Sequence, residues 1–226
     1  MPCLQSDSVH RAVVPFRFGL LFLVLATTTA ACSPEAPPPA RLDYAELANQ
    51  WETWRTSRDS LFRSASSPLL PSDQAAFDGL PYFAYDSSAA VSAALVPAMV
   101  ADTARFPTST GELRPMPVAG QLVFDVDGTE RRLMAYQAVG PDGRPTVGLF
   151  VPFRDATSGR ATYGGGRYLD LDGRPDAEGR IVVDFNKAYH PYCVYSEAYS
   201  CPLPPAENTL AVAMEAGERL GSAPSE

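Results

Sequence analysis

Residues 121–136 constrain the fold more than any other part of the chain. Apolar and polar residues alternate in Gln121-Leu-Val-Phe-Asp-Val126 and again in Thr129-Glu-Arg-Arg-Leu-Met-Ala-Tyr136, with Asp127-Gly128 between the two runs. Alternation with a period of two is typical of a strand that buries one face. An Asp-Gly pair between two such runs favours a two-residue hairpin turn. The sequence therefore predicts an antiparallel β-hairpin near the middle of the chain.

Proline content argues against a helical bundle. The 226 residues include 22 prolines, about twice the usual frequency, and proline breaks the interior of a helix. Beyond the hairpin, we expect strands at 146–153, 167–171 and 180–185, and also at 89–100 and 209–214, where helical patterning competes.

One amphipathic helix is expected before these strands, at residues 43–63. Its apolar positions, including Leu47, Trp51 and Phe62, recur at helical spacing. A further turn is expected at 74–77. We predict a mainly β (α+β) fold: a single antiparallel β domain, sandwich or barrel-like, with an N-terminal amphipathic helix. The domain spans residues 41–221, and residues 222–226 form a flexible tail.

The chain begins with the pattern of an export signal. Arg11 and Arg17 precede an unbroken apolar run at 18–26, and small residues follow up to Ala31. This is the order of a secretory signal peptide. Nine residues cannot cross a hydrocarbon core of about 30 Å as a helix, so cleavage is favoured over a retained membrane span. We expect residues 1–31 to be a signal peptide.

The residues around the expected cleavage point indicate a lipid anchor. Thr29-Ala-Ala-Cys32 resembles the lipobox of bacterial lipoproteins, which implies acylation of Cys32; a plain secretory signal is the alternative. Several acyl chains on one residue give stable anchoring, and the proline-rich residues 32–40 form a linker. We expect an exported protein attached to the membrane through Cys32. Because Ser33 replaces the aspartate of inner-membrane retention, the outer membrane is favoured.

Charge and histidine content exclude several classes of function. A formal net charge of −8 without a basic tract excludes nucleic-acid binding. After removal of residues 1–31, His190 is the only histidine in the sequence. Multi-histidine metal sites are therefore excluded, and a serine or cysteine hydrolase with a histidine base would have to use His190. We expect neither a metal nor a cofactor.

The most distinctive segments lie in the second half of the chain. In order they are Leu149-Phe-Val-Pro-Phe-Arg-Asp-Ala-Thr-Ser-Gly159, Thr162-Tyr-Gly-Gly-Gly-Arg-Tyr-Leu169, Val183-Asp-Phe-Asn-Lys-Ala-Tyr189, Cys201-Pro-Leu-Pro-Pro-Ala-Glu-Asn208 and Glu215-Ala-Gly-Glu218. Together with the helix that contains Trp51 and with Phe77-Asp-Gly-Leu-Pro-Tyr82, they resemble the family of unknown function DUF1684. The resemblance implies a fold group and no activity. His190 and Tyr192 stand where the family commonly has Asn and Pro, which counts against an essential histidine.

Polar residues at the expected strand ends suggest a ligand-binding rim. Glycines 164–166 would let backbone amides approach an anion, and Arg167 would bind it with a guanidinium fork; a plain glycine turn is the alternative. If the strands adjoin, the following residues converge on one rim: Arg154, Asp155, Tyr163, Arg167, Asp184 and Asn186. Asp155 and Asp184 would then form a carboxylate pair suited to acid–base chemistry, or structural salt bridges.

Cys193 and Cys201 bracket seven residues of a proline-flanked segment. In an exported protein this spacing favours a disulfide. The alternative is a metal clip with His190 and either Glu197 or Glu207, although the spacing fits no common zinc pattern.

Three functions remain compatible with the sequence. The first is a lipoprotein whose Arg/Asp/Gly-rich rim binds a small polar or anionic ligand or an envelope protein. The second is a cell-envelope hydrolase that uses Asp155 or Asp184 as its acid–base group and Arg154 and Arg167 to stabilise negative charge. The third is a purely structural lipoprotein. No nucleophile elbow or cofactor motif is present in the sequence, which favours binding over catalysis without deciding between them.

Overall fold

The computed structural model describes residues 42–140 and 144–221. The predicted signal peptide, Cys32, the linker and the C-terminal tail lie outside the described residues. Within the described residues, no helix has the length and apolar character needed to cross a membrane.

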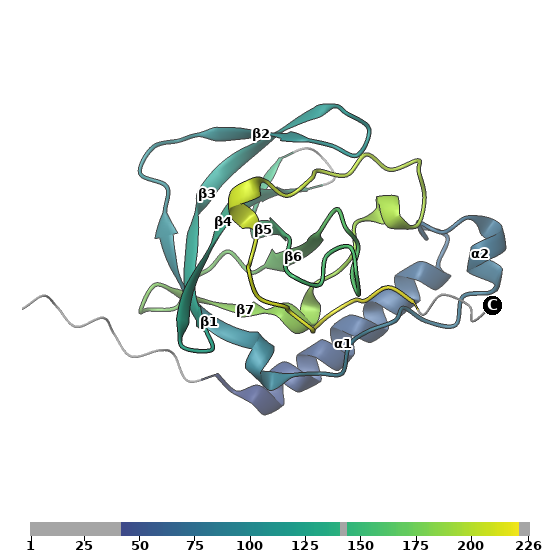
Figure 1. The fold of residues 1–226 in the computed structure, drawn as a ribbon, viewed down its shortest axis with the longest axis horizontal. Coiled ribbons are helices and arrows are strands. Elements are labelled where there is room, and N and C mark those ends of the chain that lie inside the picture. Colours follow the sequence, from purple (N-terminus) through teal and green to yellow (C-terminus); the bar gives the residue numbers. More distant parts are fainter. Residues whose placement is uncertain (1–41, 141–143, 222–226) are drawn as a thin grey trace, which may run out of the picture. The chain divides into compact units, whose positions relative to one another are not determined.

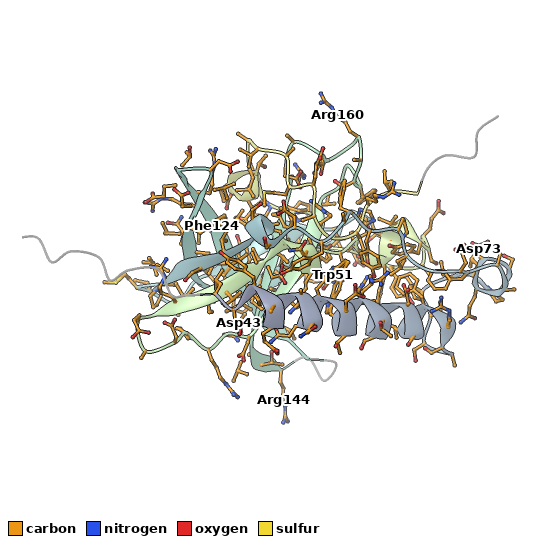
Figure 2. The ribbon with its side chains drawn as sticks, turned by 90° about the horizontal axis from the view of Figure 1, so that it is seen from below. Asp43, Trp51, Asp73, Phe124, Arg144 and Arg160 are labelled. Carbon is orange, nitrogen blue, oxygen red and sulfur yellow. The ribbon has the colours of Figure 1, made fainter. Side chains whose placement is uncertain are left out.

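Helix α1, Tyr44–Arg63, is the predicted amphipathic helix. It begins where Asp43 accepts hydrogen bonds from the backbone N–H groups of Ala45 and Glu46, both at 3.1 Å, because a carboxylate satisfies the unpaired donors of the first turn. Leu47, Trp51 and Phe62 are its buried residues, and Figure 2 shows Trp51 directed into the body of the domain. A short helix, α2 (Pro71–Ala75), follows and begins earlier than the turn expected at 74–77.

Within the described residues, seven strands form one antiparallel sheet (Figure 1). They are β1 (Ala90–Pro97), β2 (Thr103–Pro107), β3 (Leu113–Val126), β4 (Thr129–Val139), β5 (Pro145–Phe153), β6 (Arg167–Leu171) and β7 (Arg180–Asp184). The strand order is β6-β5-β4-β3-β1-β7, and β2 pairs with β3. Short 3₁₀ turns are η1 (Ser87–Ala89), η2 (Phe185–Lys187), η3 (Tyr192–Val194) and η4 (Ala206–Asn208).

The predicted hairpin is β3–β4. Val126 pairs with Thr129, and Asp127 and Gly128 both have positive φ, 53° and 73°. Positive φ at both central residues defines the turn that matches the twist of paired strands. Alternation along these strands then places Leu122, Phe124 and Leu133 in the core.

The sheet curls because β3 changes partners along its length. Its first half pairs with β2 and its second half with β1, and the register with β4 shifts between Val118 and Gly120. A Cβ at Gly120 would lie 2.3 Å from the Val96 carbonyl oxygen, so only glycine allows this close approach. At the ends of the sheet, Tyr168 of β6 and Tyr189 exchange backbone hydrogen bonds of 2.9 and 3.0 Å. The mainly β prediction is confirmed, in its barrel-like form.

The predicted strands differ from the structure in several places, and β3 begins at Leu113, before the predicted run at 121–126. Residues 209–214 are not a strand. Thr209 forms an isolated bridge with Arg154, and Leu210 and Val212 form backbone hydrogen bonds with residues 154 and 156. Residues 156 and 157 form a turn, so these bonds do not continue as a regular strand pairing. The alternation of residues 209–214 reflects the packing of Leu210 and Met214 against the core. Strand β2 was not predicted, and β1 is shorter than the 89–100 segment.

Candidate functional site

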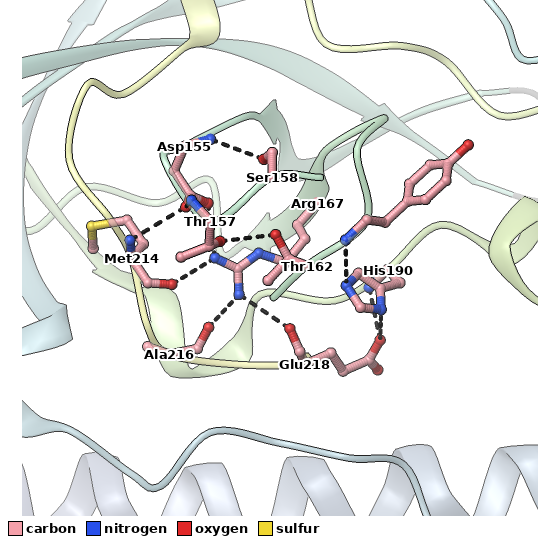
Figure 3. A network of polar contacts seen from close by, with 10 residues as sticks. Asp155, Thr157, Ser158, Thr162, Arg167, His190, Met214, Ala216 and Glu218 are labelled. Carbon is pink, nitrogen blue, oxygen red and sulfur yellow. Dashed lines mark hydrogen bonds and ion pairs between the residues drawn. The ribbon is translucent and has the colours of Figure 1, made fainter. Parts of the chain in front are cut away.

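Arg167 of the predicted rim is fully buried. Its Nη2 donates to Asp155 Oδ2 at 2.9 Å and to the Met214 carbonyl at 2.7 Å, and its Nη1 donates to the carbonyls of Ala216 and Glu218. Figure 3 shows the guanidinium enclosed by these acceptors. Burial lowers the pKa of Arg167, and the charge of Asp155 opposes this shift. The donor groups that would fork onto an anion are therefore directed at the protein itself.

Asp155 anchors the polar loop that follows β5. Its Oδ1 accepts the backbone N–H of Thr157 at 2.7 Å and that of Met214 at 3.4 Å. The loop is closed by a 2.8 Å hydrogen bond between the buried hydroxyls of Thr157 and Thr162. Asp155 and Arg167 thus join this loop to the C-terminal segment at 214–218, as a buried ion pair does when each group has further hydrogen bonds.

Asp184 and Asn186 belong to a different network. Asp184 Oδ1 accepts the backbone N–H of Asn186 at 3.0 Å and its side-chain amide at 2.9 Å. Asn186 in turn bonds both backbone groups of Asp86, at 2.9 and 2.7 Å. Burial raises the pKa of Asp184, and the Asn186 hydrogen bonds oppose that shift. The two candidate acid–base carboxylates, on Asp155 and Asp184, therefore act in separate hydrogen-bond networks.

The remaining rim candidates also contact the protein interior. Arg154 Nη2 donates to the Pro204 carbonyl at 3.3 Å. The backbone N–H of Tyr163 donates to His190 Nε2 at 3.2 Å, and burial raises the pKa of the Tyr163 phenol.

Cys193 and Cys201 are free thiols in the structure, in contrast to the predicted disulfide. The Cys201 sulfur accepts the backbone N–H of Cys193 at 3.2 Å, which satisfies it without a covalent bond. Burial raises the pKa of the Cys201 thiol to about 12. The alternative metal clip is not formed either, because among the described residues no cluster of His, Cys, Asp and Glu has metal-binding geometry.

A cavity of about 500 Å³ lies over β5 and β6, on the sheet face opposite the main core. We call it the aromatic pocket. Its lining among the described residues comprises aromatic rings, charged groups and smaller side chains: Phe150, Tyr168, Tyr189, Tyr192, Tyr199, Arg58, Arg114, Asp170, Met116, Ala138, Val139, Pro191, Ser200, Cys201 and Pro202. Apolar walls with a few polar groups, in a volume of this order, are typical of small-molecule sites.

The aromatic rings of the pocket support one another edge to face. Phe150 and Tyr168 lie 4.7 Å apart between ring centroids, and Tyr192 and Tyr199 lie 5.2 Å apart. The Tyr168 hydroxyl donates to the Pro202 carbonyl at 2.6 Å, which fixes the loop opposite the sheet. Such ring pairs restrict the motion of the walls.

Two charged groups of the pocket, Asp170 and Arg58, contact Tyr189. Its hydroxyl donates to Asp170 at 2.7 Å, and the guanidinium of Arg58 lies 4.5 Å from its ring centroid. Asp170 is accessible from the cavity, yet burial by the surrounding protein raises its pKa; the Tyr189 hydrogen bond and the charge of Arg58 oppose this shift. Arg114, on the exposed side of the pocket, donates to the Ser200 carbonyl at 2.9 Å.

Arg58 reaches the pocket from α1 and is held from behind by Glu218. Its Nε lies 2.6 Å from Glu218 Oε1, and its side chain is 11% exposed. Glu218 also accepts the His190 backbone N–H at 2.7 Å and the Tyr195 hydroxyl at 3.0 Å. Burial lowers the pKa of Arg58, but the charge and hydrogen bond of Glu218 outweigh it and the net shift is upward. Arg58 therefore stays positively charged within the wall.

A second hollow, of about 840 Å³, lies near the β3–β4 turn. Its acidic residues are used locally: Asp86 accepts the backbone N–H of Ser88 at 2.8 Å, and Asp125 accepts that of Gly128 at 2.7 Å. The aromatic pocket is the stronger candidate site because its rings are not needed to close a turn.

Residues 75–219 match the sequence profile of a protein family of unknown function, DUF1684. The chain belongs to the DUF1684 family. It is also similar to an uncharacterised protein of Haloarcula marismortui with a solution NMR structure, at 37% sequence identity and a TM-score of 0.63. The match covers 79% of this chain and 96% of the archaeal one. No curated protein matches the chain.

Several pocket residues of this DUF1684 protein were not predicted from its sequence, although a signal for some of them was present. In β6, Arg167 and Leu169 lie on the core face, so strand alternation places Tyr168 and Asp170 on the other face. Arg58 carries no comparable signal, because its position depends on the packing of α1 against residues far along the chain.

Proposed function

We propose that this DUF1684 protein is an exported, lipid-anchored protein that binds a small molecule in the aromatic pocket. The observation that carries the proposal is the cavity itself, with aromatic walls and charged groups at Tyr189. Concave sites with mostly apolar walls and a few polar groups are few per protein and are where small molecules usually bind.

Binding is favoured over the alternative of a hydrolase. The carboxylates considered for acid–base work, Asp155 and Asp184, are 6% and 4% exposed and accept hydrogen bonds from the protein. A general base must instead reach the proton of a substrate. Binding in the aromatic pocket requires neither carboxylate.

A screen of small aromatic and polar compounds by thermal shift tests the binding proposal. A ligand at a hundred times its Kd stabilises the folded state by about 2.7 kcal/mol. In a domain of this size that raises Tm by roughly 5–10 °C. No stabilisation by any compound would favour a structural role.

A pair of valine variants identifies the pocket as the site. Val139 lines the pocket and Val147 does not, while both side chains are exposed, at 45% and 62%. Val139→Trp should fill the cavity and abolish the ligand-induced shift, whereas Val147→Trp should leave it unchanged. Equal shifts in both variants would place the ligand elsewhere.

Membrane attachment is tested separately through Cys32. The natural chain should sediment with the membrane fraction, and Cys32→Ser should release it or leave it with an uncleaved signal. A Cys32→Ser protein that remains processed and membrane-bound would contradict the lipid anchor.

A further inference from the structure

We infer that the ligand of the aromatic pocket is a planar aromatic compound carrying a carboxylate or a phosphate. This inference rests on the proposed binding function and adds to it the chemical class of the ligand. The ring faces in the pocket would contact the aromatic part of the ligand, and the guanidinium groups of Arg58 and Arg114 would bind its anionic oxygens.

The ring arrangement favours a flat ligand. Phe150 and Tyr168 meet at an interplanar angle of 70°, and Tyr192 and Tyr199 meet at 68°. In an edge-to-face pair, one ring uses its face and the other its edge, so a ring face remains for an offset stack with a third ring. Tyr168 also meets Tyr189, at 5.8 Å between ring centroids, and is 6% exposed. The half-buried rings of Phe150, Tyr192 and Tyr199 are therefore the ones that a ligand can contact.

The charge of the pocket favours an anion. Among the described residues, the charged lining consists of Arg58, Arg114 and Asp170. Glu218 pairs with Arg58 at 2.6 Å, whereas none of the described carboxylates forms an ion pair with Arg114, so Arg114 is the cation that an anionic ligand can pair with. A guanidinium presents several donors in a plane that matches the oxygens of carboxylate and phosphate. A cationic ligand would instead be repelled by Arg114 at the exposed side of the pocket.

The single carboxylate of the lining is already engaged. Asp170 accepts the Tyr189 hydroxyl at 2.7 Å, and burial raises its pKa, which weakens its repulsion of an anion. Arg114 donates to a backbone carbonyl of Ser200, a neutral acceptor that does not offset its charge. An incoming anion therefore meets Arg114 at the exposed side of the pocket and Arg58 deeper in its wall.

Calorimetric titration of the full chain with matched ring compounds tests the ligand class. The compounds are benzoate and phenyl phosphate as anions, benzamide as the neutral analogue, benzylamine as the cation and inorganic phosphate as the anion without a ring. Benzoate or phenyl phosphate should bind about tenfold more tightly than benzamide, because one charge-assisted hydrogen bond accounts for such a ratio. The tighter of the two identifies the oxygen group.

Arg114→Gln should remove this preference by weakening the anions about tenfold while leaving benzamide unchanged. Arg105→Gln is the matched control: Arg105 is an exposed arginine on the neighbouring strand β2 and lies outside the pocket lining. Its substitution makes the same charge change and should leave anion affinity within about twofold, because Arg105 pairs with Pro115 and strand alternation therefore places it on the opposite face of the sheet from Arg114.

The possible failures of the two proposals differ. Benzamide or benzylamine binding at least as tightly as the anions, with Val139→Trp abolishing it, would overturn the ligand class and keep the binding function. Inorganic phosphate binding as tightly as phenyl phosphate would overturn the aromatic requirement. No binding by any of the compounds, or binding that Val139→Trp does not change, would overturn both proposals.

Discussion

Replacing Arg167 tests whether the glycine-rich motif stabilises the fold or binds a ligand. Arg167→Met keeps much of the side-chain volume but leaves Asp155 as a buried charge without its partner, and the carbonyls of Met214, Ala216 and Glu218 without their donor. Removal of one member of a buried ion pair lowers the free energy of unfolding by about 3–5 kcal/mol. The Tm of a domain of this size should fall by roughly 6–20 °C.

Thermal and urea unfolding measure this loss, and two further variants control for it. Arg132→Met breaks an exposed pair with Glu130, whose side chains are 56% and 60% exposed, and should change stability by less than about 1 kcal/mol. Asp155→Asn with Arg167→Met should lose less than the sum of the single variants, because no unpaired charge remains. An unchanged Tm for Arg167→Met, with loss of ligand affinity, would refute the structural role.

Three further predictions concern protonation, backbone geometry and thiol chemistry. Burial lowers the pKa of His190 to about 3 from 6.5, so below pH 6.5 the unfolded chain binds a proton that the folded chain does not, and stability falls with pH towards 3. In urea unfolding at a series of pH values, the free energy of unfolding of the natural chain minus that of His190→Asn should decrease as pH falls from 7 to 4. A constant difference would contradict the shift. Gly217→Ala should lower the free energy of unfolding by about 1–3 kcal/mol more than Gly128→Ala. Both glycines have positive φ, but a Cβ at Gly217 would lie 2.4 Å from the Ala188 carbonyl oxygen, whereas a Cβ at Gly128 would have no described atom within 4 Å. Equal losses would mean that the clash relaxes. Because burial raises the pKa of Cys201 to about 12, iodoacetamide should alkylate it far more slowly in the folded chain than in urea, as followed by peptide mass spectrometry; equal rates would show an exposed thiol.

Local signals predicted the elements that the chain forms from its own neighbours. The spacing of apolar residues predicted α1, and Asp127-Gly128 predicted the turn between β3 and β4, because both signals lie within the elements themselves. Strand β2 was not predicted because its alternation, with Ala104 and Phe106 on one face, extends over only five residues, and it pairs only with the first half of β3. The 209–214 segment was wrongly predicted as a strand. Its alternating apolar residues pack against the core, but the segment has no neighbouring strand with which it pairs regularly.

The candidate site was predicted less well, because it depends on contacts between distant residues. The sequence indicated that Arg167 and Asp155 matter, and the structure places them together in the interior. The alternation of β6 was available to separate buried Arg167 from pocket-facing Tyr168 and Asp170. In contrast, Arg58 and Tyr189 meet only after α1 has packed beside the end of the sheet, and no local pattern encodes that encounter.

The position of Glu218 near the end of the chain has a consequence for the order in which the protein is completed. Glu218 pairs with Arg58 across 160 residues, and the acceptors that surround Arg167 come from residues 214–218. These residues follow α1 and the seven described strands in the sequence, so a ribosome synthesises them later. Until then Arg58 lacks its carboxylate and Arg167 lacks the carbonyls that make its burial tolerable. Folding of this domain therefore cannot finish before residues 214–218 have been synthesised, and a chain cut before residue 214 leaves both arginines without these partners.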